Sequence, residues 1–322
     1  MNSPSHAILD DDPTGAQSVC GVPVLTEWDP TTVRGVLDEG PAGVHLLTNS
    51  RACTAQRAYD TVLAAARSAD RAGARWPAVL RGDSTLRGHL LPEYKAVRAV
   101  CFPDQTPVLL LAPALPAAGR ITVDGCHLVG YDGERRPVAT TDYARDRLFG
   151  YTTSRLLEWA EERFDGYFAA RNGDELHLEQ SAYGGDDAVA AMIAQAGRGD
   201  GPRVVVPDAT SDSDVRLIAE GYRQAVTAGA AVVVRCAPTF VGALCRSEAT
   251  SFANPPQGAG PVLVICGSYV PLSTAQLATL AAAHPGCLIE ADPSLLVGPG
   301  GSYARESSPR SRAPGWPTEA SR

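Results

Sequence analysis

Short apolar runs rich in β-branched residues alternate along this chain with longer segments rich in Ala, Arg and Glu. The runs are continuously apolar, a pattern typical of strands that are covered on both faces. They predict strands at 6–9, 22–26, 44–48, 78–81, 108–112, 204–207, 231–235 and 262–266. The longer segments predict helices at 54–72, 90–100, 154–163, 186–196, 214–227 and 272–283. This alternation predicts the α/β class, with a mainly parallel sheet flanked by helices.

One stretch departs from the alternation. Residues 121–129 carry Asp124-Gly125 at their centre, which predicts a β-hairpin.

The end of the chain has a different composition from the rest. Residues 254–260, NPPQGAG, are turn and linker residues and predict a domain boundary. We therefore expect a first domain at 1–253 and an incomplete second α/β domain at 261–298, with a short strand at 287–290. Residues 299–322 contain no Val, Ile, Leu, Met or Phe, which predicts a disordered tail.

Charge and targeting signals exclude several classes of protein. The formal charge is 28 − 36 = −8, which argues against sequence-independent binding of nucleic acid. The first residues lack the basic and apolar regions of a secretory signal, and no apolar run approaches the length of a membrane span. The eight cysteines and six histidines show no metal-ligand spacing. We expect a cytoplasmic protein with a small-molecule partner, no nucleic-acid or membrane partner and no His/Cys metal site.

Candidate chemistry gathers in the loops that follow the predicted strands, where open parallel sheets bind ligands. Asp10-Asp11-Asp12 follows the first strand, and three adjacent carboxylates need a shared Mg²⁺, cationic or hydroxyl-rich ligand. Arg51 follows the third strand and offers a planar fork to a carboxylate or phosphate. Helix caps and Asx turns are the structural alternative for both loops.

Two further loops add to this set. Asp83, Ser84 and Arg87 combine a candidate general base with a hydroxyl and a guanidinium, although an Asp–Arg turn can also be purely structural. Gly267-Ser268 lies between a predicted strand and helix, where free N–H groups favour phosphate. The sequence contains no P-loop, no G-x-G-x-x-G after the first strand and no G-x-S-x-G elbow.

Taken in order, these loops resemble the four-carbon acid sugar kinase family. The resemblance rests on DDDPTG at 10–15, TNSR at 48–51, DSTLRG at 83–88, PA…GRIT…G within 113–125 and VLVICGS…TAQ within 262–276. It implies a sugar-acid-binding N-terminal domain, an ATP-binding C-terminal domain and Mg²⁺-ATP-dependent phosphorylation of an acid such as threonate, erythronate or a 3-oxo relative.

The resemblance also implies roles for individual residues. Asp83 or Asp12 would accept the hydroxyl proton, and Asp11 and Ser84 would bind the substrate. Arg51 and Arg87 would hold its carboxylate or the transferring phosphate, and Ser268 would contact ATP.

The chain departs from the family pattern near its end, where the Gly/Pro/Ser/Arg-rich residues replace the rest of an ATP domain. This indicates a truncated or frameshifted member with impaired kinase activity, and an unfinished domain whose exposed apolar surface leaves a homo-oligomer open. Two alternatives stay open. One is a haloacid-dehalogenase-like phosphatase using Asp10 and Asp12, which leaves DSTLRG unexplained; the other is a non-catalytic sugar-acid-binding remnant.

Overall fold

The computed structural model describes residues 5–15, 19–74, 79–131, 133–247, 262–267 and 271–291. The chain divides into two units, Met1–Pro256 and Gln257–Arg322, which are described separately below.

The first unit is built on an eight-stranded sheet whose recorded pairings are all parallel. Its order is β2-β3-β1-β4-β11-β5-β10-β9. The strands are β1 (His6–Asp10), β2 (Val24–Leu25), β3 (Gly43–Leu47), β4 (Val79–Arg81), β5 (Val108–Ala112), β9 (Gly173–Leu176), β10 (Val204–Pro207) and β11 (Val232–Cys236). The predicted α/β class with a mainly parallel sheet is confirmed.

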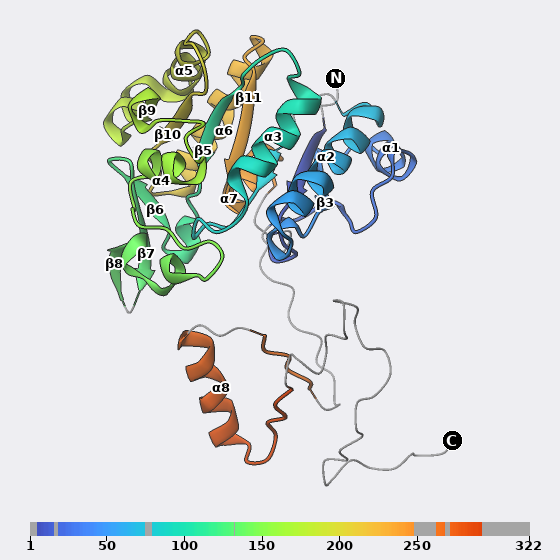
Figure 1. Ribbon diagram of the computed structural model, residues 1–322, viewed down its shortest axis with the longest axis vertical. Coiled ribbons are helices and arrows are strands. Elements are labelled where there is room, and N and C mark those ends of the chain that lie inside the picture. Colours follow the sequence, from blue (N-terminus) through green and yellow to red (C-terminus); the bar gives the residue numbers. More distant parts are fainter. Residues whose placement is uncertain are drawn as a thin grey trace. The chain divides into compact units, whose positions relative to one another are not determined.

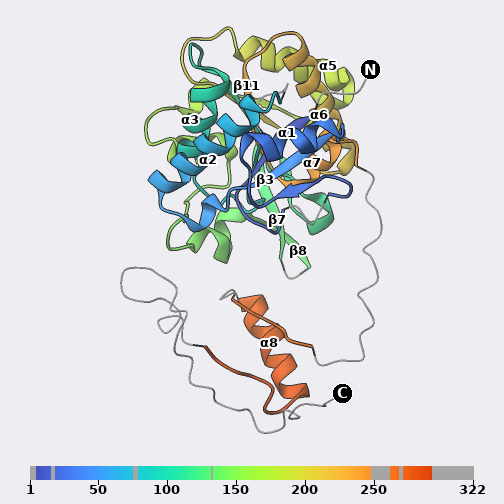
Figure 2. The ribbon, with the colours of Figure 1, turned by 90° about the vertical axis from the view of Figure 1, so that its right-hand side faces the viewer.

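Helices cover both faces of this sheet (Figure 1). On one face lie α1 (Pro30–Asp38), α2 (Ala55–Arg71), α3 (Leu90–Cys101) and α4 (Leu156–Arg163); on the other lie α5 (Leu178–Ala196), α6 (Asp212–Thr227) and α7 (Pro238–Leu244). Figure 2 shows α2 and α3 to one side of the sheet and α6 and α7 to the other. Successive strand residues alternate between the two cores, as Leu109 and Leu110 do, because successive side chains point to opposite faces. Both faces are thus buried, which explains the continuously apolar strand sequences.

The order of the strands fixes where a ligand can bind. From β1 the chain goes to the edge strand β2, comes back inward to β3 beside β1, and then crosses to β4 on the other side of β1. Such a reversal leaves a crevice beyond the carboxyl ends of the central strands, where open α/β sheets bind ligands. The loop after β1 lies at this position.

A second, antiparallel sheet lies at the same end of the unit (Figure 1). It comprises β6 (Ile121–Val123), β7 (Cys126–Tyr131) and β8 (Glu134–Pro137). The predicted hairpin is confirmed, because β6 pairs with β7 across Asp124 and Gly125, which have φ angles of 51° and 68°. The Asp208 carboxylate accepts the N–H groups of both turn residues, at 2.7 and 3.0 Å, and ties the hairpin to the end of β10.

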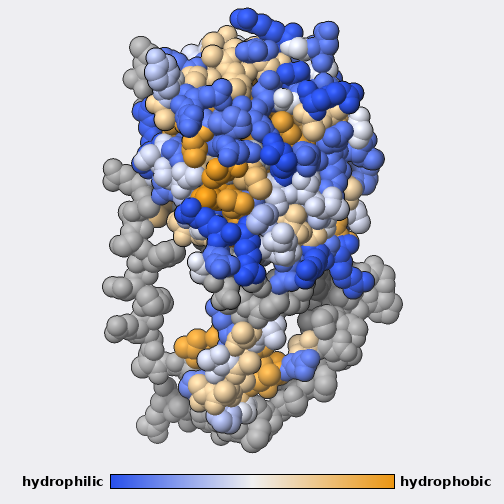
Figure 3. All heavy atoms as spheres, turned by 90° about the vertical axis from the view of Figure 1, so that its left-hand side faces the viewer, coloured by the Kyte–Doolittle hydropathy of each residue, from blue (hydrophilic) through white to orange (hydrophobic). Residues whose placement is uncertain are grey.

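Several elements differ from the prediction. The predicted strands at 262–266 and 287–290 are wrong: these residues are described without strand structure, and nothing in the described part of their unit pairs with them. Val262, Leu263 and Ile265 are more than four-fifths exposed, and α8 (Pro271–Ala283) is the helix of this unit within the described residues. Figure 3 shows hydrophobic side chains on this unit, whereas the face of the first unit seen there is largely hydrophilic.

Other differences lie in the first unit. The predicted strand at 22–26 is reduced to Val24–Leu25, and α5 begins at Leu178, eight residues before its predicted start, with a kink at Gly185. Helices α1 and α7 and strands β8 and β9 were not predicted. Strand β9, GDEL, lies at the sheet edge and is half-exposed, so it lacks the apolar signal of the central strands. The linker at 254–260 and the tail at 299–322 lie outside the described residues.

Among the helices that the structure describes, none combines the length and apolar character needed to cross a bilayer.

Candidate functional site

The three acidic residues after β1 surround a buried arginine. Asp10, Asp11 and Asp12 are all buried, and so is Arg81 at the end of the neighbouring strand β4. The Arg81 Nη2 group donates to Asp10 Oδ1 and to the Asp12 carbonyl, and its Nη1 lies 3.4 Å from Asp11 Oδ1. His45 Nδ1, on β3, lies 2.9 Å from Asp10 Oδ2. Burial lowers the pKa of His45 to about 4, so this ring is neutral near pH 7 and donates to the carboxylate.

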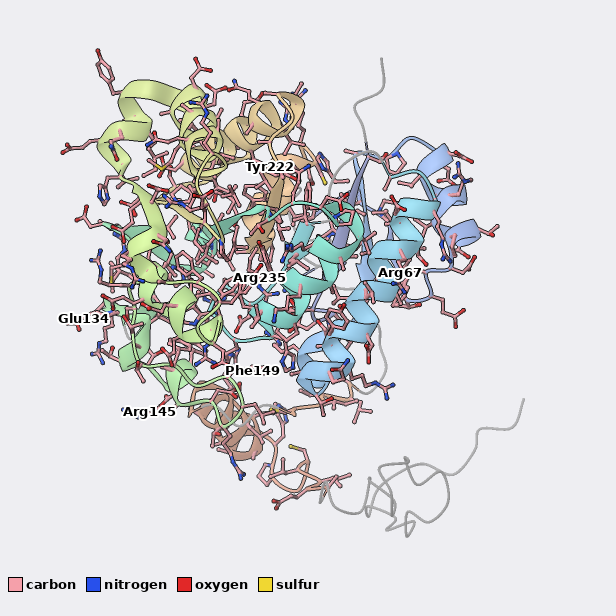
Figure 4. All side chains as sticks on the ribbon, turned by 45° about the horizontal axis from the view of Figure 1, so that its top comes forward. Arg67, Glu134, Arg145, Phe149, Tyr222 and Arg235 are labelled. Atoms are coloured by element: carbon pink, nitrogen blue, oxygen red, sulfur yellow. The ribbon has the colours of Figure 1, made fainter. Side chains whose placement is uncertain are left out.

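A second buried arginine joins the loops from the other side of β4. Arg235 is the penultimate residue of β11. Its Nη2 lies 3.1 Å from Asp11 Oδ2, and its Nη1 pairs with the buried Glu93 of α3. Glu93 also accepts a hydrogen bond from Ser50 Oγ, at 2.6 Å, in the loop after β3. Figure 4 places Arg235 among the central elements, whereas Arg67 projects from the outside of α2. This chain of contacts fixes the ends of β1, β3 and β11 relative to α3.

Glycines provide the space for the two arginines. A Cβ atom at Gly15 would collide with the Arg81 guanidinium, and one at Gly82 or Gly88 would collide with that of Arg235. The glycines of the DDDPTG and DSTLRG segments therefore accommodate buried guanidinium groups.

A half-buried set of charges extends outward from this network. Arg51 pairs with Asp12, and its Nη1 lies 3.5 Å from Asp83 Oδ2. Arg87 Nε donates to the same Asp83 oxygen at 2.6 Å, and its Nη1 lies 3.8 Å from Asp146. Asp83 thus holds two arginines from different loops. We call Arg51, Asp83 and Arg87 the loop network, and Asp10, Asp11, Arg81, Glu93 and Arg235 the buried network.

The two networks shift the pKa of their carboxyl groups in opposite directions. Burial of Asp11 raises its pKa to about 7 against the attraction of Arg235, and the nearby Glu93 raises it further. Burial also acts to raise the pKa of Asp83, but Arg87, Arg51 and the Thr85 hydrogen bond outweigh it and lower that pKa to about 2. Asp83 is therefore ionised throughout the physiological range, and Asp11 titrates within it.

Ser84 connects the loop network to the antiparallel sheet. Arg120 Nη1 donates to Ser84 Oγ at 2.6 Å, and His127 Nε2 lies 2.8 Å from the Ser84 carbonyl oxygen. Burial lowers the pKa of His127 to about 4, and since a carbonyl can only accept, the neutral ring carries its proton on Nε2. The guanidinium groups of Arg87 and Arg120 lie 5.4 and 5.9 Å from the centre of the Tyr143 ring.

Two residues in these loops have a backbone conformation that non-glycine residues rarely adopt. Asn49 has φ 50° and Leu86 has φ 69°. Such conformations persist only where the surroundings enforce them, and they cluster at functional sites. Leu86 is buried, and the Tyr151 hydroxyl donates to the neighbouring Thr85 carbonyl at 2.8 Å, which holds this loop in place.

The three aspartates do not fit a Mg²⁺ ion in this arrangement. Their oxygens lie close enough together to hold a metal, but the Arg81 guanidinium already contacts all three residues. The cation that these carboxylates require is therefore supplied by the chain itself. A second grouping of Asp124, His177 and Asp208 has a structural explanation, because both Asp208 oxygens accept N–H groups of the hairpin turn.

The residues predicted from the sequence come together at one end of the sheet. Asp11, Asp12, Arg51, Asp83, Ser84 and Arg87 all lie in the two networks or in direct contact with them. Ser268 lies outside the described residues. Asp10, the nucleophile of the phosphatase alternative, is fully buried and paired with Arg81 and His45.

The sequence predicted no specific role for Arg81, Glu93, Arg235, Arg120 and Tyr143, although Arg120 belongs to the GRIT motif. A charged residue at or next to the end of an otherwise apolar strand, as in VLR and VVVRC, was the available signal for Arg81 and Arg235.

Comparison with known proteins identifies the family. A family model described as a sugar-binding N-terminal domain matches residues 6–244, which include both networks. A D-erythronate kinase from Heliobacterium modesticaldum is 31% identical over 302 residues, which is 91% of this chain. The chain belongs to the four-carbon acid sugar kinase family.

Two further relatives support the placement in this family. A D-threonate kinase from Salmonella typhimurium is 30% identical over 190 residues, or 58% of this chain. A solved structure from Bordetella bronchiseptica, a domain of unknown function with bound citrate in a domain-swapped dimer, is 25% identical with a TM-score of 0.57. The match covers 88% of this chain and 65% of the Bordetella chain. The chain spans 64% of the length of the erythronate kinase and 38% of that of the threonate kinase.

Proposed function

We propose that this protein acts in the ATP-dependent phosphorylation of a four-carbon sugar acid of the erythronate or threonate type, with residues 1–253 binding the acid. The observation that carries the proposal is the meeting of Asp12, Arg51 and Asp83 from three separate loops at the topological switch point of the sheet. The names of the two kinases to which the chain is similar support the substrate class.

The chemistry of a sugar acid matches these side chains. Its hydroxyl groups require carboxylate and hydroxyl partners, which Asp11, Asp12, Asp83 and Ser84 offer, and its negative charge requires guanidinium groups. The solved relative with bound citrate supports a small, hydroxylated carboxylic acid as ligand.

Asp83 suits the position next to the reacting hydroxyl. Because Arg51 and Arg87 keep it ionised and fixed, its carboxylate can accept the hydrogen bond of a substrate hydroxyl and orient it. Phosphoryl transfer depends mainly on such positioning and on stabilisation of charge, with the hydroxyl proton leaving late. Asp12, which shares Arg51, is the second candidate for this role.

ATP would be bound by residues 261–298, with Ser268 at a phosphate, and Mg²⁺ would arrive with the nucleotide. No Mg²⁺ ligand is assigned among the described residues, because Arg81 fills the aspartate cluster.

The test measures ATP-dependent phosphorylation of D-erythronate and D-threonate, together with calorimetric binding of each acid and of ATP. We expect binding of a sugar acid, and a turnover that falls by about 10²- to 10⁴-fold in Asp83→Asn. Arg67→Ala, which alters an exposed residue of α2, is the matched control. Absence of sugar-acid binding by the unaltered chain would refute the proposal, and binding without ATP affinity would support a sugar-acid-binding module in its place.

A further inference from the structure

Arg120 lies beside the loop network but differs from its members. It follows the short 3₁₀ segment Pro116–Ala118 and precedes β6, and its side chain is half-buried. Its guanidinium donates to Ser84 Oγ, next to Asp83 in the chain, and lies against the Tyr143 ring that Arg87 also contacts.

The difference concerns charge compensation. Arg51, Arg81, Arg87 and Arg235 each have at least one carboxylate within 4.0 Å. Arg120 has none among the residues that the structure describes; its recorded side-chain partners are a neutral hydroxyl and an aromatic ring. A half-buried guanidinium of this kind retains unused donors and an unneutralised charge, both of which an anionic ligand would satisfy.

We infer that Arg120 binds the carboxylate of the acceptor and sets the preference for a sugar acid over a neutral polyol. This inference rests on the proposed function and specifies it further. Arg51 and Arg87 are already paired with Asp83. Arg120 has no such partner among the described residues and can offer its planar guanidinium to the carboxylate of the substrate. Its contact with Ser84 places that guanidinium next to the loop that carries Asp83. One end of the substrate would then be held by Arg120 and a hydroxyl by Asp83.

The experiment compares binding of D-erythronate with binding of erythritol, which has the same carbon count and no carboxylate. The variants are Arg120→Met and Arg120→Lys, with Arg136→Met, an exposed residue of β8, as the control. We expect Arg120→Met to weaken binding of the acid by about 10- to 100-fold, as for loss of a hydrogen-bonded charge pair, and to leave polyol binding unchanged. Arg120→Lys keeps the charge but loses the planar guanidinium, so its affinity for the acid should lie between those of Arg120→Met and the unaltered protein. Arg136→Met should bind the acid as the unaltered protein does.

The ratio of the affinities for D-erythronate and erythritol distinguishes recognition of the carboxylate by Arg120 from a purely structural role of this residue. A structural role would lower the melting temperature and weaken both ligands equally, and that result would overturn the inference. So would an acid preference that survives in Arg120→Met. Failure of the unaltered protein to bind the acid would instead refute the proposed function, and this inference with it.

Discussion

The buried network and the loop network contain the same chemical groups but use them differently. In the buried network, Arg81 and Arg235 face Asp10, Asp11 and Glu93, so two cations serve three carboxylates, and the pKa of Asp11 is raised. In the loop network, two guanidinium groups share Asp83, whose pKa is lowered. The first arrangement holds strand ends together, and the second holds a single carboxylate ionised and fixed. Similar side chains therefore give a scaffold in one place and a candidate reactive group in the other.

The largest effect is expected where the scaffold loses a cation. Arg235→Ala leaves Asp11 and Glu93 buried without their shared partner, and breaking a buried pair in this way costs about 3–5 kcal/mol. Urea unfolding followed by circular dichroism measures the change in free energy of unfolding. Arg67→Ala should stay within about 0.5 kcal/mol. Equal losses in the two variants would show that the buried network contributes nothing specific.

The next prediction concerns the protonation of Asp11. Because its folded-state pKa of about 7 lies above the unfolded value of 3.8, the folded state binds the extra proton between these pH values. This group therefore lowers the stability of the protein as the pH rises from about 4 to 7. Asp11→Asn cannot ionise, so its free energy of unfolding should improve relative to the unaltered protein across that window. The improvement should be on the order of a few kcal/mol, since a tenfold change in an acid constant corresponds to about 1.4 kcal/mol.

The quantity to measure is the difference in free energy of unfolding between Asp11→Asn and the unaltered protein, because the pH dependence of all other groups is common to both. Burial lowers the pKa values of His6, His45 and His127 to about 4, so these rings make stability rise with pH in the same window. They are present in both proteins and cancel. A difference that stays constant from pH 4 to 7 would contradict the protonation assigned to Asp11.

Ionisation of Asp83 should change the stability of the protein with pH in the opposite direction from that of Asp11. Its folded-state pKa of about 2 lies below the unfolded value of 3.8, so its ion pairs stabilise the protein above pH 4, and this stabilisation is lost as the pH falls towards 2. Asp83→Asn should therefore cost about 2 kcal/mol at pH 5 and progressively less at pH 4 and pH 3. The measurement is urea unfolding at these three pH values. A cost that grows on acidification would reverse the assignment.

The sequence was sufficient to predict the sheet but not the charge network. Apolar runs such as 108–112 and 204–207 predicted strands because burial on both faces leaves a strong local signal. The loops carrying Asp12, Arg51 and Asp83 could be placed together because parallel strands end at one edge. Arg235 and Glu93 lie far apart in the chain, and only the insertion of β11 between β4 and β5 brings them together. The strand predicted at 262–266 failed for a related reason, since an apolar run becomes a strand only when another strand pairs with it.

The smallest effect tests the aromatic contact at the outer side of the loop network. Tyr143 lies beneath both Arg87 and Arg120, and a cation–π contact of this kind is worth about 0.5–1 kcal/mol. Tyr143→Leu should reduce the free energy of unfolding by about that amount, while Tyr143→Phe, which keeps the ring, should remain close to the unaltered protein. If the ring orients Arg120, Tyr143→Leu should also weaken sugar-acid binding, and Tyr143→Phe should leave it unchanged. Should Tyr143→Phe lose as much stability as Tyr143→Leu, the hydroxyl rather than the ring face would be the group that matters. The cation–π contact would then add nothing to the ion pairs and hydrogen bonds that hold the loop network.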